Sequence, residues 1–310
     1  MIPPKRSLLI TVGLVTLLSG TLTTALIKPP NGSALRHNPT VLAAAALFQG
    51  NGYSYRRAIT IDHTKVPNTD QSNFPVLISG TYSYLATVPN SGNVQNANGY
   101  DVIFTSDTAC TTKLNHEVQT YSATTGAVNY WVKVPSVSHT TDTTIYLCYG
   151  NSAITTDQST KTSVWDSNFK AVYHLDDQAA NTSVIDSTAN GSNGVNAANT
   201  TSKSVTGKVG KALTYNGTSD NTATGVTQPS SFTWECWFQL TAWTTQAGSS
   251  NYSTLMAGTY ASAGALLMLW KDSAYVVQFA SDNAGGITRD RKSTRLNSSH
   301  VSESRMPSSA

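Results

Sequence analysis

The sequence predicts an all-β protein whose strands form antiparallel sandwiches. Charged residues make up only 12% of the 310 residues, and Glu occurs three times, as Glu117, Glu235 and Glu303. Poor helix formers (Thr, Ser, Asn, Gly) dominate together with the strand formers Val, Tyr, Ile and Trp. Short strand-like runs alternate with turn residues, and nothing resembles a helix longer than a turn or two.

The first β unit is expected over residues 53–151. Its spacing of short runs suits an antiparallel β-sandwich. A stretch rich in Ser, Thr, Asp and Gln, residues 152–163, then reads as a linker. The six expected strands are 55–61, 74–79, 100–105, 116–121, 129–134 and 143–150.

A second β unit is expected over residues 164–289. The Asn-Gly pairs at 190–191 and 216–217 are strong turn signals. Residues 275–282 form the last recognisable strand. The other strand-bearing stretches are 164–177, 186–195, 211–222, 231–240, 253–260 and 265–270.

The N-terminus has the layout of a secretory signal. Lys5 and Arg6 precede an apolar run, and small residues follow it as far as Ala25. Residues 1–27 are therefore expected to be a signal peptide, or a signal anchor, since 8–27 is about long enough to span a bilayer. Residues 28–52 look like a disordered spacer. In either case the body lies outside the cytoplasm.

The net charge of +3 is unevenly placed. The first 46 residues carry +4 and residues 290–310 carry +2, which leaves −3 for the body of the protein. A mildly acidic body without a basic patch excludes a nucleic-acid partner. Contact with a membrane is expected only through an uncleaved N-terminal segment.

Two resemblances run along the body. The ordered landmarks "YRRAITID", "NFPVLI", "DVIFTSD", "KLNHEV", "YWVKVPSV" and "TTIYLCYGN" resemble an exported bacterial domain family of unknown function. The landmarks "YHLDD", "DSTANGSNG", "GKALTYNGTSDN" and "FTWECWF" resemble the laminin-G-like branch of the concanavalin A-like lectin/glucanase superfamily. The second resemblance implies a jelly roll of two antiparallel sheets for residues 164–289.

The C-terminal segment 290–310 does not match the rest of the chain. With a suitable choice of codons, Asp290–His300 resembles a translated sequencing-library adapter in every position. A genuine basic tail is the rival interpretation, but the segment lacks interleaved aromatic residues and carries only +2. The expectation is an artefactual tail that truncates the jelly roll and leaves it incomplete.

Three cysteines are present. Cys110 and Cys148 lie in one β unit of an exported chain, which favours a disulfide over two buried thiols acting as small hydrophobic groups. Cys236 alternates with Phe232, Trp234 and Phe238, so it is expected to face a core.

Catalysis is not expected. Glycoside hydrolysis needs a pair of carboxylates, and Glu117 and Glu235 lie in different units without the family's catalytic motif.

Calcium is the candidate cofactor. Asp220 and Asn221 follow the "YNGTS" turn, where the resemblance implies calcium ligands in several related modules, and Asp186 is a second candidate. Asp and Asn also make turns by bonding their own backbone, and that alternative remains open.

Two aromatic residues are candidates for a ligand-binding surface. Trp237 could stack on a sugar, with Trp243 beside it, or these rings could cover an open sheet face. The function expected is an exported bacterial protein of the cell surface or medium that binds a polysaccharide or glycoprotein, or adheres. The alternatives are a fragment of a larger polysaccharide-degrading enzyme and a structural spacer of a large surface protein.

Overall fold

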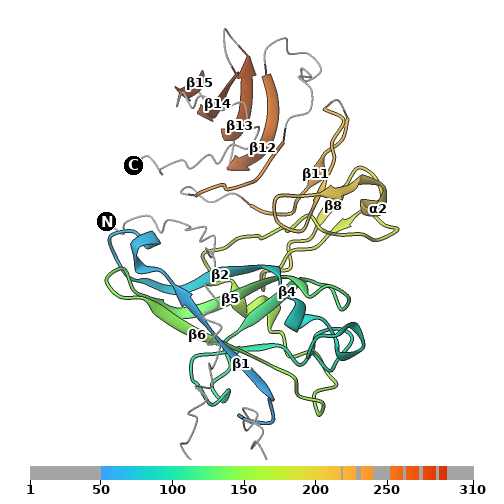
Figure 1. The fold of residues 1–310 in the computed structure, drawn as a ribbon. Helices are drawn as coiled ribbons and strands as arrows, with labels where there is room; N and C mark the ends of the chain where they lie inside the picture. Colours follow the sequence, from blue (N-terminus) through green and yellow to red (C-terminus); the bar gives the residue numbers. More distant parts are fainter. Residues whose placement is uncertain are drawn as a thin grey trace, which may run out of the picture. The chain divides into compact units, whose positions relative to one another are not determined.

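The computed structural model describes residues 50–217, 219–227, 232–239, 252–260, 263–271, 275–283 and 286–291. The predicted signal segment and most of the predicted spacer lie outside these residues. The chain divides between Ser159 and Thr160 into two compact units (Figure 1). The all-β prediction is confirmed for the described residues, in which the two α-helices have four residues each. No helix in the described ranges has the length and apolar character needed to cross a membrane.

The first unit consists of two three-stranded antiparallel sheets. One sheet has the order β1-β6-β3 and the other the order β2-β5-β4. Short 3-10 helices η1 (His63–Lys65), η2 (Ser83–Leu85) and η3 (Val88–Asn90) lie in the connections. The strands are β1 (Tyr55–Ile61), β2 (Gln71–Thr81), β3 (Ile103–Thr105), β4 (His116–Tyr121), β5 (Ala127–Val137) and β6 (Thr143–Tyr149).

Strand β5 shows why these residues form a sheet. Successive side chains of a strand point to opposite faces, and every second residue of β5 is buried over most of its length. The buried face is made of β-branched and aromatic side chains, which pack well on a pleated surface. Its members are Val128, Tyr130, Val132 and Val134, each at most 2% exposed.

Both sheets contribute to a shared core. The ring of Phe104 in β3 contacts the rings of His116 in β4 and Tyr130 in β5, edge to face, with centroids 5.5 and 5.3 Å apart. Because β3 belongs to one sheet and β4 and β5 to the other, these contacts pack the sheets face to face as a sandwich. Burial lowers the pKa of His116 to about 4, so this imidazole is a neutral core group at neutral pH.

A buried carboxylate fixes the long connection between β2 and β3. Asp101 is fully buried and accepts hydrogen bonds from four backbone N–H groups. Two belong to Gln95 and Asn96 in its own connection, and two belong to Gly150 and Asn151 at the end of β6. The connection is therefore fastened to the strand end by one side chain.

The second unit contains several small antiparallel sheets. The three-stranded sheet β11-β8-β7, the two-stranded sheet β10-β9 and the four-stranded sheet β12-β13-β14-β15 are separate in hydrogen bonding. Helices α1 (Lys161–Val164) and α2 (Thr200–Lys203) are each one turn long. The strands are β7 (Ser183–Val184), β8 (Gly194–Asn196), β9 (Ser204–Thr206), β10 (Lys211–Leu213), β11 (Thr222–Ala223), β12 (Tyr252–Tyr260), β13 (Ala263–Lys271), β14 (Tyr275–Asn283) and β15 (Gly286–Arg291).

Some predicted strands differ from the structure. No strand forms over 164–177, where the pairing is a single bridge between Tyr173 and Asp186, or in the described part of 231–240. Periodicity alone predicted these strands, whereas a strand also needs a partner backbone to bond. A further strand, β15, follows the last strand recognisable in the sequence and pairs Asp290 with Phe279 and Arg291 with Gln278.

Both predicted Asn-Gly turns are present. Gly191 and Gly217 have φ of 63° and 74°, the left-handed region that glycine enters without steric cost. Each turn is therefore built where the sequence places it.

Candidate functional site

The predicted disulfide between Cys110 and Cys148 is present in the first unit. Their Cα atoms are 6.1 Å apart, and both residues are at most 1% exposed. They lie in a small buried cluster with Tyr53 and Ile103. The alternative of two separate buried thiols is wrong. The bond ties the connection after β3 to strand β6.

Cys236 is the free cysteine among the described residues, and it is partly buried. Burial raises the pKa of its thiol, which is the opposite of what a nucleophilic cysteine needs. The side chain suits packing rather than chemistry.

The two carboxylates predicted as calcium ligands are both engaged by protein donors. Asp186 accepts hydrogen bonds from the backbone N–H groups of Val172, Thr188 and Ser192 at 2.9–3.0 Å, and from the Thr188 hydroxyl at 2.7 Å. These bonds lower its pKa although burial acts in the opposite direction. Asp186 thus organises a turn and carries no unoccupied oxygen for an ion.

Asp220 forms an ion pair with Lys203 and accepts a hydrogen bond from the backbone N–H of Asn216. The hydrogen bond from Lys203 is the main reason why the pKa of Asp220 is lowered. The neighbouring Asn221 offers its backbone carbonyl to the N–H of Ala197. These contacts agree with the turn-forming alternative. Neither Asp186 nor Asp220 belongs to the cluster of His and carboxylate ligand atoms found among the described residues.

The predicted aromatic surface is only partly described. Trp237 is partly buried, and the ammonium group of Lys208 lies 5.7 Å from its ring centroid. Trp234 packs instead against Phe232, with centroids 4.9 Å apart. Trp243 lies outside the described residues, so its pairing with Trp237 stays a prediction.

The two glutamates considered for hydrolysis have unlike surroundings. Glu117 is buried on β4, opposite Trp131, whereas Glu235 is exposed in the second unit. Because successive side chains of β4 point to opposite faces, Glu117 lies on the face away from His116 and the core, beside Trp131.

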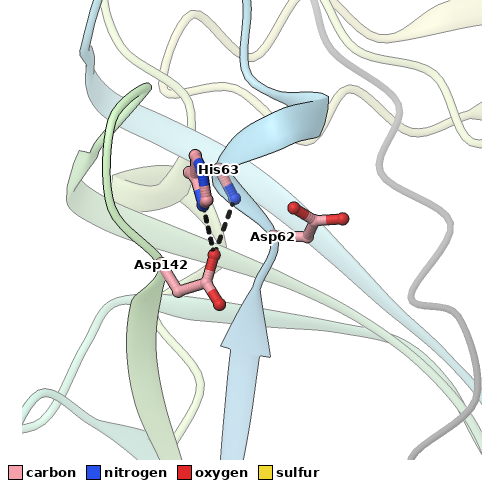
Figure 2. A group of neighbouring side chains, drawn as sticks. All are labelled: Asp62, His63 and Asp142. Carbon is pink, nitrogen blue, oxygen red and sulfur yellow. Dashed lines mark hydrogen bonds and ion pairs between the residues drawn. The ribbon is translucent and has the colours of Figure 1, made fainter.

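A group that the sequence did not suggest lies at one end of the first sandwich. Asp62, His63 and Asp142 bring three possible ligand atoms within 4.8 Å of one another (Figure 2). His63 donates two hydrogen bonds to the same oxygen of Asp142, one from its backbone N–H at 3.0 Å and one from ring Nδ1 at 2.7 Å. The Asp62 carboxylate caps η1 by accepting from the N–H and hydroxyl of Thr64.

A second His–Asp pair, His139 and Asp70, has the same hydrogen-bond geometry. His139 donates its backbone N–H and its Nδ1 to one oxygen of Asp70, at 2.9 and 2.6 Å. Both pairs join the same two connections, residues 62–70 between β1 and β2 and residues 138–142 between β5 and β6. Each connection supplies one His and one Asp, so the two pairs are reciprocal.

These reciprocal hydrogen bonds determine the charge state of the two carboxylates. Hydrogen bonds from His63 and His139 lower the pKa values of Asp142 and Asp70, so these carboxylates stay ionised and hold the connections together. Asp70 and His139 make the same contacts without a third acidic neighbour. We therefore assign both pairs as structural hydrogen-bonded links between the two connections that join the sheets, rather than as metal ligands.

Sequence reasoning missed this arrangement because His63 and Asp142 are far apart in the chain and form no motif. The available signal was that each connection carries a His together with an Asp beside a strand end. Only the pairing of β1 with β6 and of β2 with β5 brings them together.

Comparison with known proteins gives one match. Residues 98–190 match a family described as a domain of unknown function (DUF2341). The match overlaps the predicted domain of unknown function over residues 98–151 and continues to the Asp186 turn. No curated protein and no solved structure matches the chain. The similarity to a domain of unknown function is therefore established for residues 98–190, from β3 to the turn around Asp186.

Proposed function

We propose that the chain is an exported, non-catalytic bacterial protein, secreted or held at the cell surface, that binds a carbohydrate or adheres to a partner. The observation that carries the proposal is the buried disulfide between Cys110 and Cys148. Disulfides persist in oxidising compartments and are rare in the cytosol. The apolar run behind Lys5 and Arg6 supports the same route.

The binding role draws on the architecture of the first unit. Its rigid sandwich holds the connections at its ends, and such connections are where binding residues gather in β-sandwich proteins. A mildly acidic body favours neither nucleic acid nor a membrane surface as the partner.

For the second unit we propose a laminin-G-like jelly roll that is cut short by an adapter-derived tail. The antiparallel sheet β12–β15 supports a jelly roll, since such folds are built from antiparallel sheets. The adapter resemblance of residues 290–300 supports the cut.

A two-part experiment tests this proposal. The full chain, expressed with its own N-terminal segment in a bacterium that forms disulfides in its periplasm, should appear outside the cytoplasm with two blocked thiols and one reactive thiol after denaturation. Purified protein on an array of neutral and acidic glycans should then bind at least one class. Retention in the cytoplasm with three reactive thiols would contradict export, and an empty array would contradict glycan binding.

A further inference from the structure

One arginine at the edge of the first sandwich is held in place by aromatic side chains. Tyr55 and Arg57 lie on the same face of the edge strand β1, two residues apart. The Arg57 guanidinium carbon sits 3.8 Å from the centroid of the Tyr84 ring. Its Nε donates a hydrogen bond to the hydroxyl of Tyr149 at 3.2 Å. Ring stacking and one hydrogen bond thus fix the guanidinium plane.

The aromatic wall around Arg57 is itself rigid. The rings of Tyr55 and Tyr149 stack with centroids 5.2 Å apart, and the rings of Tyr149 and Tyr84 lie 5.6 Å apart. Gly150 lets Tyr55 lie against the backbone, because a Cβ at this position would come within 2.6 Å of the Tyr55 ring. Such a site loses little side-chain entropy when a ligand arrives.

The polar groups of this wall belong to partly buried side chains and have no protein partner among the described residues. Among the described residues, no hydrogen bond or ion pair involves the two terminal nitrogens of Arg57 or the hydroxyls of Tyr55 and Tyr84. These atoms are also not among the fully buried polar atoms that lack a partner. Burial raises the pKa of Tyr84 to about 12, so its hydroxyl keeps its proton and can donate.

This set of groups selects an anionic ligand. A guanidinium with a free pair of nitrogens binds a carboxylate through two parallel hydrogen bonds. Tyrosine hydroxyls can form hydrogen bonds with the hydroxyl groups of a polyol, and the tyrosine rings provide an apolar surface beside those bonds. Within an acidic body, a partly exposed arginine without a carboxylate partner gives the edge a local positive charge.

We propose that Arg57, walled by Tyr55 and Tyr84, binds the carboxylate of an acidic glycan, a polysaccharide built from uronic acid units. The choice of a saccharide rests on the proposed function, whereas the choice of an anion rests on the arginine alone. The site lies in the first unit and is independent of the predicted aromatic surface of Trp237.

Titration of the full chain with the trimer of galacturonic acid tests the site, with the neutral trimer of galactose as the control ligand. We expect binding of the acidic trimer only, weakening as salt is raised. Arg57→Gln should reduce this binding at least about tenfold, since a charge-assisted hydrogen bond is lost. Arg57→Lys should retain part of it, because the charge remains but the planar fork does not.

Arg56→Gln is the matched control, because it removes the same charge one residue away. Arg56 lies on the opposite face of β1, over the Tyr146 ring and bonded to the carbonyl of Thr108. Its substitution should leave the affinity for the acidic trimer within about twofold. Tyr84→Phe, which retains the ring under the guanidinium, should weaken binding several-fold. Thermal melts of all variants check that the fold is intact.

The outcomes separate this site from the general proposal. Equal losses in the two arginine variants, or no binding of the acidic trimer by a chain that binds neutral glycans, would overturn the site and leave the proposed function standing. An array without any bound glycan would overturn both. Arg57-dependent binding of an oligoglutamate peptide without binding of the acidic trimer would overturn the saccharide assignment.

Discussion

Removing the disulfide gives the sharpest test of how the first unit is stabilised. The double substitution Cys110→Ala and Cys148→Ala keeps two small side chains in the buried cluster while it opens the covalent loop. The bond closes a sequence separation of 38 residues. Loop-closure entropy for that length corresponds to about 4 kcal/mol at 25 °C in the chain-entropy model.

This amount is large compared with the total stability of a domain of this size, about 5–15 kcal/mol. Urea unfolding of residues 50–159 measures it, with the fluorescence of Trp131, the one tryptophan of that segment, as the signal. With a urea slope of about 2 kcal/mol per molar, the midpoint should fall by roughly 2 M. The parent segment unfolded under a reducing agent is the control, and its midpoint should lie close to that of the double variant.

A midpoint within about 0.3 M of the parent would refute the reasoning, because it would show that the denatured chain gains almost no freedom when the bond is absent. A larger loss than predicted would instead point to the cavity created beside Tyr53 and Ile103.

Four further predictions follow from particular residues. Purified protein should hydrolyse no glucan, and turnover abolished by Glu235→Gln in a reducing-sugar assay would contradict this. Asp142 has a lowered pKa, so its contribution to stability is present above the unfolded-state value near pH 4 and is lost as pH falls through the folded value. Melts between pH 7 and pH 2 should therefore lose less stability in Asp142→Asn than in the parent, and parallel curves would argue against the pair with His63. Ile145→Val in the core should cost about 0.5–1.5 kcal/mol in urea titrations, whereas no change would mean that this side chain is loosely packed. Re-sequencing of the locus with other library chemistry should replace residues 290–310, and recovery of the same codons would remove the adapter interpretation.

Much of the first sandwich could be predicted from its sequence. Strands β1 and β4 have the predicted bounds, because alternating β-branched and aromatic residues are bounded there by turn residues. Strand β3 is shorter than expected, since residues 100–102 precede its pairing with β6 and Asp101 instead serves backbone N–H groups. Periodicity shows which side a residue faces but not where a partner strand begins.

Some features of the candidate sites could likewise be predicted from the sequence, and others could not. The Cys110–Cys148 bond was predictable because cysteines in one exported domain have few other roles. The environments of Asp186 and Asp220 were not, because the donors that occupy them come from turns and from Lys203, which only the folded chain places. The stacking of Arg57 on Tyr84 likewise depends on the connection between β2 and β3, which carries Tyr84 to β1. No local sequence pattern predicts this contact.

The disulfide also determines what a protease can release from this protein. The turn between β4 and β5 lies between the two bonded cysteines, and so do both of those strands. A single backbone cut in that turn leaves the two pieces covalently joined through Cys110 and Cys148. A nicked molecule would therefore migrate as an intact chain on a non-reducing gel and as two fragments after reduction, and its cut strands would stay attached to the remainder of the molecule.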